Sequence, residues 1–82
     1  MEECMQKVFF MNHQTILYLP MDEICYIQWK NRKLYVHTIN QVYPVSGHLK
    51  EYEYLLNYHF KKVNRSTIIN YNVITYIDKD LG

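Results

Sequence analysis

Apolar and polar residues alternate over many short stretches of this chain, and alternation with a period of two is typical of strands that bury one face. The pattern predicts strands over residues 7–10, 15–19, 24–29, 33–37, 42–45, 60–63, 67–69 and 73–77. Polar or proline-containing segments between them predict turns at 12–14, 20–23, 30–32, 40–41 and 70–72. Strands joined by such short turns favour antiparallel hairpins, so the chain is predicted to be mainly β.

One stretch has a different period. Its apolar residues recur at three- and four-residue steps, at Leu49, Tyr52, Leu55 and Leu56. This spacing predicts one α-helix of about ten residues. Ser46 is its candidate N-cap, because a hydroxyl there can accept hydrogen bonds from the first free backbone N–H groups.

The position of each strand in a sheet is predicted less directly. Pro44 removes a backbone donor, so the strand over 42–45 is expected at a sheet edge, paired with 34–39. Eighty-two residues make a single domain spanning 1–82. Residues 1–6 are polar and expected to be disordered. Residues 78–80 look like the start of a hairpin whose returning strand is missing after residue 82.

Charge is distributed unevenly along the chain. The net charge is only +1, yet residues 28–67 contain seven basic and two acidic residues. The basic residues fall mainly in two bursts, KNRK at 30–33 and KKVNR at 61–65. Two bursts at strand ends fit a local phosphate-binding patch, although two solvated strand ends would give the same pattern. Nine tyrosines suit the half-buried positions of a thin domain, or alternatively a stacking platform for single-stranded nucleic acid.

Other chemistries lack their sequence signals. The four histidines have no metal-binding spacing, and Cys4 and Cys25 form no CxxC pair. No glycine-rich loop is present that could cradle a nucleotide. The sequence therefore predicts no metal, no cofactor, no small-molecule substrate and no enzyme activity. Without a signal peptide or a long apolar run, we expect a cytoplasmic protein with reduced thiols and no membrane association.

Three segments carry a resemblance to a known family. They read DEICYIQ at 22–28, HLKEYEYLL at 48–56 and FKKVNRSTIIN at 60–70. In this order and spacing they resemble the LytTR family of bacterial DNA-binding output domains, over roughly residues 15–80. The resemblance implies small antiparallel sheets layered around one short α-helix, with the C-terminal hairpin of the family fold incomplete here. It also implies a transcription regulator of a two-component system, usually fused behind a receiver domain, that places loops in the major groove of double-stranded DNA.

The same resemblance assigns the site. Base-reading positions fall on the hairpin tip at 30–32 and on Asn64 and Arg65. Arginine matches guanine and asparagine matches adenine with paired hydrogen bonds, whereas lysines contact phosphates. The full set of expected DNA-binding residues is Lys30, Asn31, Arg32, Lys33, Lys61, Lys62, Asn64, Arg65 and Ser66. To bind one duplex together, the two basic segments must project from the same side of the domain.

Each assignment has an alternative. Arg32 would also serve as a solubilising charge, and Arg65 could pair with Glu51 or Glu53. Ser66 could bind a phosphate or cap the local backbone. A domain of the same fold could instead act as a homodimerising protein-interaction module that does not bind DNA.

Overall fold

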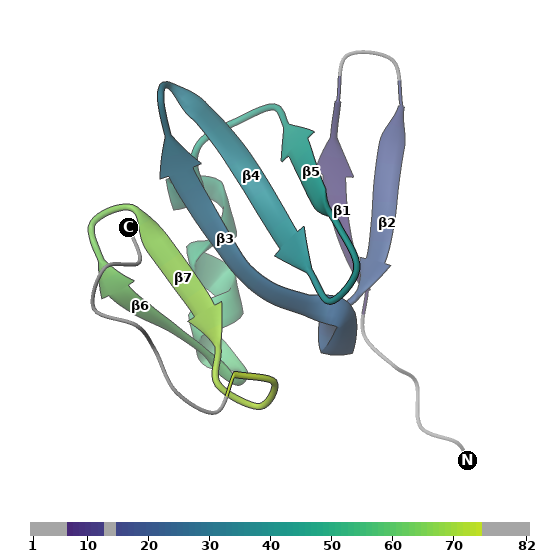
Figure 1. The fold of residues 1–82 in the computed structure, drawn as a ribbon. Helices are drawn as coiled ribbons and strands as arrows, with labels where there is room; N and C mark the ends of the chain where they lie inside the picture. Colours follow the sequence, from purple (N-terminus) through teal and green to yellow (C-terminus); the bar gives the residue numbers. More distant parts are fainter. Residues whose placement is uncertain (1–6, 13–14, 75–82) are drawn as a thin grey trace.

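The computed structural model describes residues 7–12 and 15–74 of the chain, which form strands and two short 3-10 helices (Figure 1). In chain order the elements are β1 (Lys7–Met11), β2 (Ile16–Pro20), η1 (Met21–Glu23), β3 (Ile24–Lys30), β4 (Lys33–Thr38), β5 (Val42–Val45), η2 (Leu49–Asn57), β6 (Phe60–Asn64) and β7 (Thr67–Asn70). The mainly β fold expected from alternation is confirmed. Most strand ends lie within a residue of their predicted positions.

The strands form two antiparallel sheets. β1 and β2 make a two-stranded hairpin, and the other five strands are ordered β5-β4-β3-β7-β6. β5 lies at one edge and pairs with β4, with Pro44 opposite Tyr35, as its proline predicted. β3 and β7 lie side by side although about forty residues separate them in the sequence. This long-range pairing joins the two halves of the larger sheet.

The core lies between one face of the five-stranded sheet, helix η2 and the β1–β2 hairpin. Alternation along β3 and β4 directs Ile27 and Val36 into it, both fully buried. The hairpin contributes Phe10, whose ring stacks on Tyr52 of η2 at 4.9 Å between centroids. Figure 1 shows η2 behind the sheet, so the face of β3, β4 and β5 toward the viewer is the outer face.

The predicted helix is present, but it differs in winding and in its cap. η2 is a 3-10 helix, and its buried residues Leu49, Tyr52 and Leu55 follow at intervals of three. A 3-10 helix has three residues per turn, so side chains at this interval lie on one face and enter the core together. The prediction of Ser46 as N-cap is wrong. His48 occupies that position without a side-chain capping hydrogen bond.

Asn70, at the end of β7, ties distant parts of the chain together. Its side chain is fully buried. The Nδ2 group donates to the carbonyl oxygens of Met21, at 3.1 Å, and Ile24, at 3.0 Å. Its Oδ1 accepts from the backbone N–H of Asn72 at 3.0 Å. One amide therefore satisfies two buried carbonyls near the start of β3 and also closes the turn predicted over 70–72.

Some predicted segments fall outside what the structure describes. Val73 belongs to the turn after β7 and Ile74 has no regular structure, so a strand is not seen at these positions. The rest of the strand predicted over 73–77 lies outside the described residues. The same holds for residues 1–6, for 78–80 and for the tip of the 12–14 turn.

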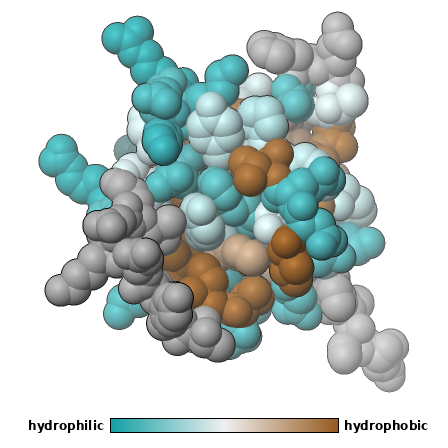
Figure 2. All heavy atoms as spheres, in the orientation of Figure 1, coloured by the Kyte–Doolittle hydropathy of each residue, from teal (hydrophilic) through white to brown (hydrophobic). Residues whose placement is uncertain are grey.

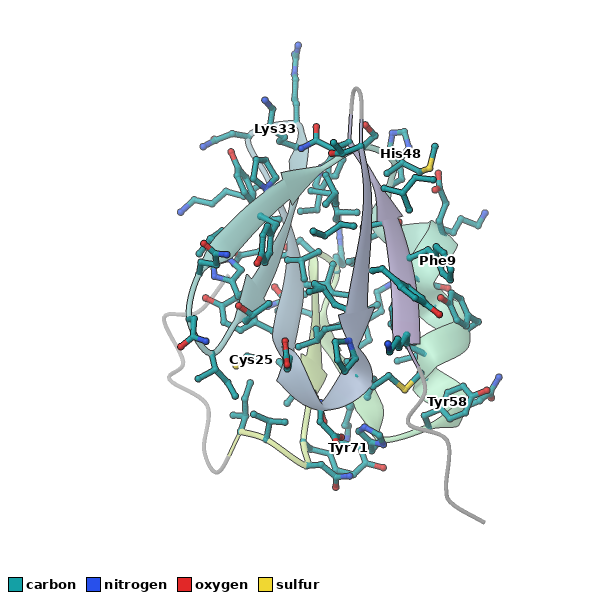
Figure 3. All side chains as sticks on the ribbon, turned by 90° about the vertical axis from the view of Figure 1, so that its right-hand side faces the viewer. Phe9, Cys25, Lys33, His48, Tyr58 and Tyr71 are labelled. Carbon is teal, nitrogen blue, oxygen red and sulfur yellow. The ribbon has the colours of Figure 1, made fainter. Side chains whose placement is uncertain are left out.

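The β1–β2 hairpin has an exposed apolar face. Its outward side chains include Phe9 and Tyr18, which are 56% and 53% exposed and whose ring centroids lie 4.2 Å apart. Met11 and Ile16 pair across the hairpin on the same side and are also exposed. Figure 3 shows Phe9 pointing away from the core. The homodimer that the sequence analysis left as an alternative stays untested.

Candidate nucleic-acid interface

The β3–β4 hairpin ends in a two-residue turn with an unusual backbone. Asn31 and Arg32 have φ angles of 55° and 64°, and positive φ at both positions is the requirement of type I′ turns. Asparagine tolerates this region, whereas the Cβ of arginine is disfavoured there and glycine would fit best. Both side chains are exposed. A long cationic side chain thus occupies a position where the turn itself favours no side chain.

This conformation predicts a gain in stability for Arg32→Gly. Removing the Cβ relieves a left-handed backbone strain of about 1–2 kcal/mol. This exceeds the about 0.4–1 kcal/mol by which the extra freedom of glycine stabilises the unfolded chain, so we expect a Tm higher by a few degrees. Arg32→Ala is the matched control, because it removes the guanidinium but keeps the Cβ, and it should leave the Tm near that of the wild type. Thermal melts followed by circular dichroism measure both. A lower Tm for Arg32→Gly than for Arg32→Ala would contradict the strain at this turn.

The β6–β7 turn is held by its own side chains. Asn64 Oδ1 accepts from the backbone N–H of Ser66 at 2.9 Å and from its hydroxyl at 3.2 Å. Ser66 therefore makes the local capping contact that the sequence left open, and Asn64 fixes the turn on both sides of Arg65. The Arg65 side chain is exposed at this turn.

A single backbone hydrogen bond places the two turns next to each other. The N–H of Trp29 donates to the carbonyl of Ser66 at 2.8 Å. Trp29 immediately precedes the basic hairpin tip, and the register continues with Gln28 opposite Thr67. The turns at 30–33 and 64–66 therefore lie at the same end of the sheet (Figure 1). The two arginine-bearing turns thus share one end of the sheet, whereas Lys61 and Lys62 of the second basic segment lie along β6.

The four candidate lysines are not equivalent. Lys30 and Lys33 are paired across the hairpin beside its turn and are exposed, and Figure 3 shows Lys33 at this end of the molecule. Lys61 and Lys62 lie along edge strand β6, and as successive residues of a strand they face opposite sides. Figure 2 shows hydrophilic residues over the end of the sheet where β3 and β4 turn.

Lys62 has a partner within the protein. Its Nζ lies 2.8 Å from Glu53 Oε2 of η2. The hydrogen bond from Lys62, together with its charge, lowers the pKa of the Glu53 carboxyl. Lys62 is therefore directed toward the helix side of the sheet, and Lys61 shares the opposite face with Tyr26 and Ile69.

Neither arginine has an ion pair among the residues that the structure describes. The predicted alternative of Arg65 paired with Glu51 or Glu53 is not found there. Glu53 contacts Lys62, and a carboxylate oxygen of Glu51 lies 4.0 Å from Nδ1 of His48. Both arginine side chains are exposed at the sheet end.

His48 is a residue that sequence reasoning did not place at this end. Its ring stacks on Trp29 with centroids 5.0 Å apart, and its side chain is largely exposed. Figure 3 shows it at the same end as Lys33. The sequence carried no signal for this contact, because it depends on how the segment after β5 crosses the end of the sheet.

Three observations concern features outside the two turns. They include no group of three or more His, Cys, Asp or Glu side chains able to hold a metal ion. Burial raises the pKa of the Cys25 thiol, which disfavours the reactive thiolate. Neither helix of the described part is long or apolar enough to span a membrane.

An antiparallel sheet with two adjacent cation-bearing turns has the features of a β-type nucleic-acid-binding domain. The family model of the LytTr DNA-binding domain matches residues 14–82, so the chain belongs to the LytTR family. It is also similar to a solved structure from Bacillus cereus, the LytTr DNA-binding domain of a protein described as a methyl-accepting/DNA response regulator. The two are 29% identical with a TM-score of 0.71, over 92% of this chain and 70% of that one. No curated protein sequence matches.

Proposed function

We propose that this domain binds duplex DNA in a sequence-specific manner and regulates transcription through the two turns at one end of its larger sheet. The observation that carries the proposal is the Trp29–Ser66 hydrogen bond, which brings the turns of the two exposed arginines, Arg32 and Arg65, to one end of the sheet. Such an edge is narrow and rigidly backed by a sheet, which suits insertion into the major groove.

The roles follow from side-chain chemistry. Arg32 and Arg65 read guanine edges, because a guanidinium offers two parallel donors to O6 and N7. Asn31 is exposed and can offer the oxygen and the NH2 of its side-chain amide to an adenine. Asn64 has its Oδ1 committed to Ser66, so it holds the turn that presents Arg65 and retains only Nδ2 for DNA.

The lysines supply affinity that does not depend on sequence. Lys30 and Lys33 contact phosphates flanking the hairpin tip. Lys61 lies on β6 farther from the two turns and contacts phosphates farther along the duplex. Lys62 contributes least to binding because it already forms an ion pair with Glu53. Ser66 acts through the shape of its turn.

The cellular setting is proposed from the family. The relative from Bacillus cereus is described as a response regulator. We propose that this domain is likewise the output part of a two-component regulator in the cytoplasm, controlled by a receiver domain. This function requires no catalytic step.

Selection from a random duplex pool, followed by affinity measurement at several salt concentrations, tests the proposal. We expect one sequence to be enriched and the affinity to fall steeply with salt. Lys33→Ala should weaken binding to all duplexes alike and flatten the log–log salt slope by about one. Lys7→Ala is the matched control, since Lys7 belongs to the separate β1–β2 hairpin and pairs with Pro20 at the end of that hairpin away from its turn. Equal affinity for single strands and duplexes would exclude the proposed function.

A further inference from the structure

A pocket opens on the outer face of the larger sheet, directly beside the β3–β4 turn. Its volume is about 260 Å³. The residues that line it are Gln28, Lys30, Asn31, Tyr35, His37 and Val42. The register explains this grouping, because Gln28 pairs with Tyr35 and His37 with Val42, so the side chains of three neighbouring strands share one face.

The described residues that line the pocket are rich in hydrogen-bond donors and include no carboxylate. Lys30 carries a full positive charge, and the Asn31 amide and Tyr35 hydroxyl are neutral donors. His37 stacks on Tyr26 with ring centroids 4.0 Å apart, which fixes its ring at the pocket wall. Burial, and then the charge of Lys30, lower the pKa of His37, so at neutral pH it offers one N–H and no second positive charge. The site therefore suits an anion of single charge.

We propose that this pocket binds a phosphate of the DNA backbone, with Tyr35 and His37 as phosphate ligands beside Lys30. The inference rests on the proposed function, since it extends the same interface from the turn onto the outer face of the sheet. Neither Tyr35 nor His37 belongs to the set of residues that the sequence predicted.

Size and charge both favour a backbone phosphate. The volume is below the range of pockets that enclose drug-sized ligands, and it fits a small group that enters from an open side. A phosphodiester carries one negative charge, which Lys30 alone can balance. A free phosphate or phosphomonoester is close to dianionic at neutral pH and would be poorly neutralised here.

A phosphate-by-phosphate scan tests the inference on a duplex first selected as described above. Single phosphates are replaced with neutral methylphosphonates, and the affinities of the wild type, Tyr35→Phe and His37→Gln are compared. We expect Tyr35→Phe to bind the unmodified duplex about tenfold more weakly, because it loses one hydrogen bond to a charged group. At one position, replacing the phosphate with a methylphosphonate should weaken binding by the wild type. The same replacement should weaken binding by Tyr35→Phe only a little below its affinity for the unmodified duplex.

Tyr71→Phe is the control for the loss of a tyrosine hydroxyl. Tyr71 is 53% exposed and lies at the opposite end of the molecule from Lys33 (Figure 3), so this variant should bind as the wild type does. Equal melting temperatures of the variants would show that the fold is kept. A loss of fold would weaken binding at every phosphate position, so it could not produce an effect of Tyr35→Phe that depends on one position.

The outcomes separate the two proposals. If the wild type selects no duplex, the proposed function fails. If the wild type binds but Tyr35→Phe responds to every methylphosphonate as the wild type does, the pocket does not hold a backbone phosphate and the inference is overturned. Competition with inorganic phosphate is a further test. If inorganic phosphate bound tightly enough to displace the duplex, the pocket would be a site for a free anion, and the inference would also be overturned.

Discussion

Arg32→Ala and Arg65→Ala are each expected to weaken binding to the selected duplex by about 1–3 kcal/mol and to relax its base preference at one position. The physical reason is that each guanidinium offers a fork of donors to one guanine, and alanine leaves those acceptors without a partner. The two turns are adjacent, so the effects of the double variant need not add. Fluorescence anisotropy with matched and single-base-changed duplexes measures affinity and preference together.

Substitution by lysine separates base reading from charge. Arg32→Lys and Arg65→Lys keep a positive charge but lose the planar fork, so they should restore general affinity without restoring base preference. Lys7→Ala, in the separate β1–β2 hairpin, should leave both quantities unchanged. If both alanine variants bound the selected duplex as tightly and as selectively as the wild type, the arginines would not be the base readers.

Asn70→Ala is expected to destabilise the fold by about 3 kcal/mol, without any direct role for Asn70 in DNA contact. The substitution removes the side-chain donor to the carbonyls of Met21 and Ile24 and the acceptor of the Asn72 N–H. The Met21 carbonyl keeps the hydrogen bond from the N–H of Ile24, so the Ile24 carbonyl loses most. Each unsatisfied buried group costs about 1–3 kcal/mol, and a small domain has a free energy of unfolding of only about 5–15 kcal/mol. Urea unfolding measures the loss in the free energy of unfolding. In a thermal melt, a loss of this size should lower the Tm by more than about 10 °C.

Two further variants show which atoms of Asn70 matter. Asn70→Asp keeps the shape and the acceptor but replaces the donor with a second oxygen facing two carbonyls, so it should be at least as destabilising as alanine. Asn40→Ala, at an exposed position of the β4–β5 turn, should change the unfolding free energy by less than about 0.5 kcal/mol. Wild-type stability of Asn70→Asp would show that the two hydrogen bonds to the carbonyls contribute nothing.

The strands and turns of this protein were largely predictable because their signals are local. The hairpin tip at 30–32 follows from Asn31 between two aromatic and β-branched runs, and Pro44 alone indicates an edge strand. Helix η2 was predictable in position but not in winding. Over nine residues, apolar side chains at steps of three and four fit both an α-helix and a 3-10 helix, and only the packing of Leu49, Tyr52 and Leu55 distinguishes them.

The candidate site was predictable in composition but not in assembly. Basic and amide side chains in two bursts identified Arg32 and Arg65, yet their contacts depend on other elements. Lys62 was expected on phosphates, and the structure pairs it with Glu53 nine residues earlier, on η2. Tyr35 and His37 gave no signal, because strand residues of this kind are common and only the register of three strands brings them to one pocket.

By itself, the sequence determined the local conformations and the kinds of side chain at each turn, since backbone preference and alternation act over a few residues. Only the tertiary structure decided that the two turns share one end of the sheet. That adjacency requires β3 to pair with β7, so that Trp29 binds Ser66 across thirty-seven positions of chain. No local pattern encodes such a pairing, because it depends on the burial of Ile27, Ile68 and their neighbours in a common core.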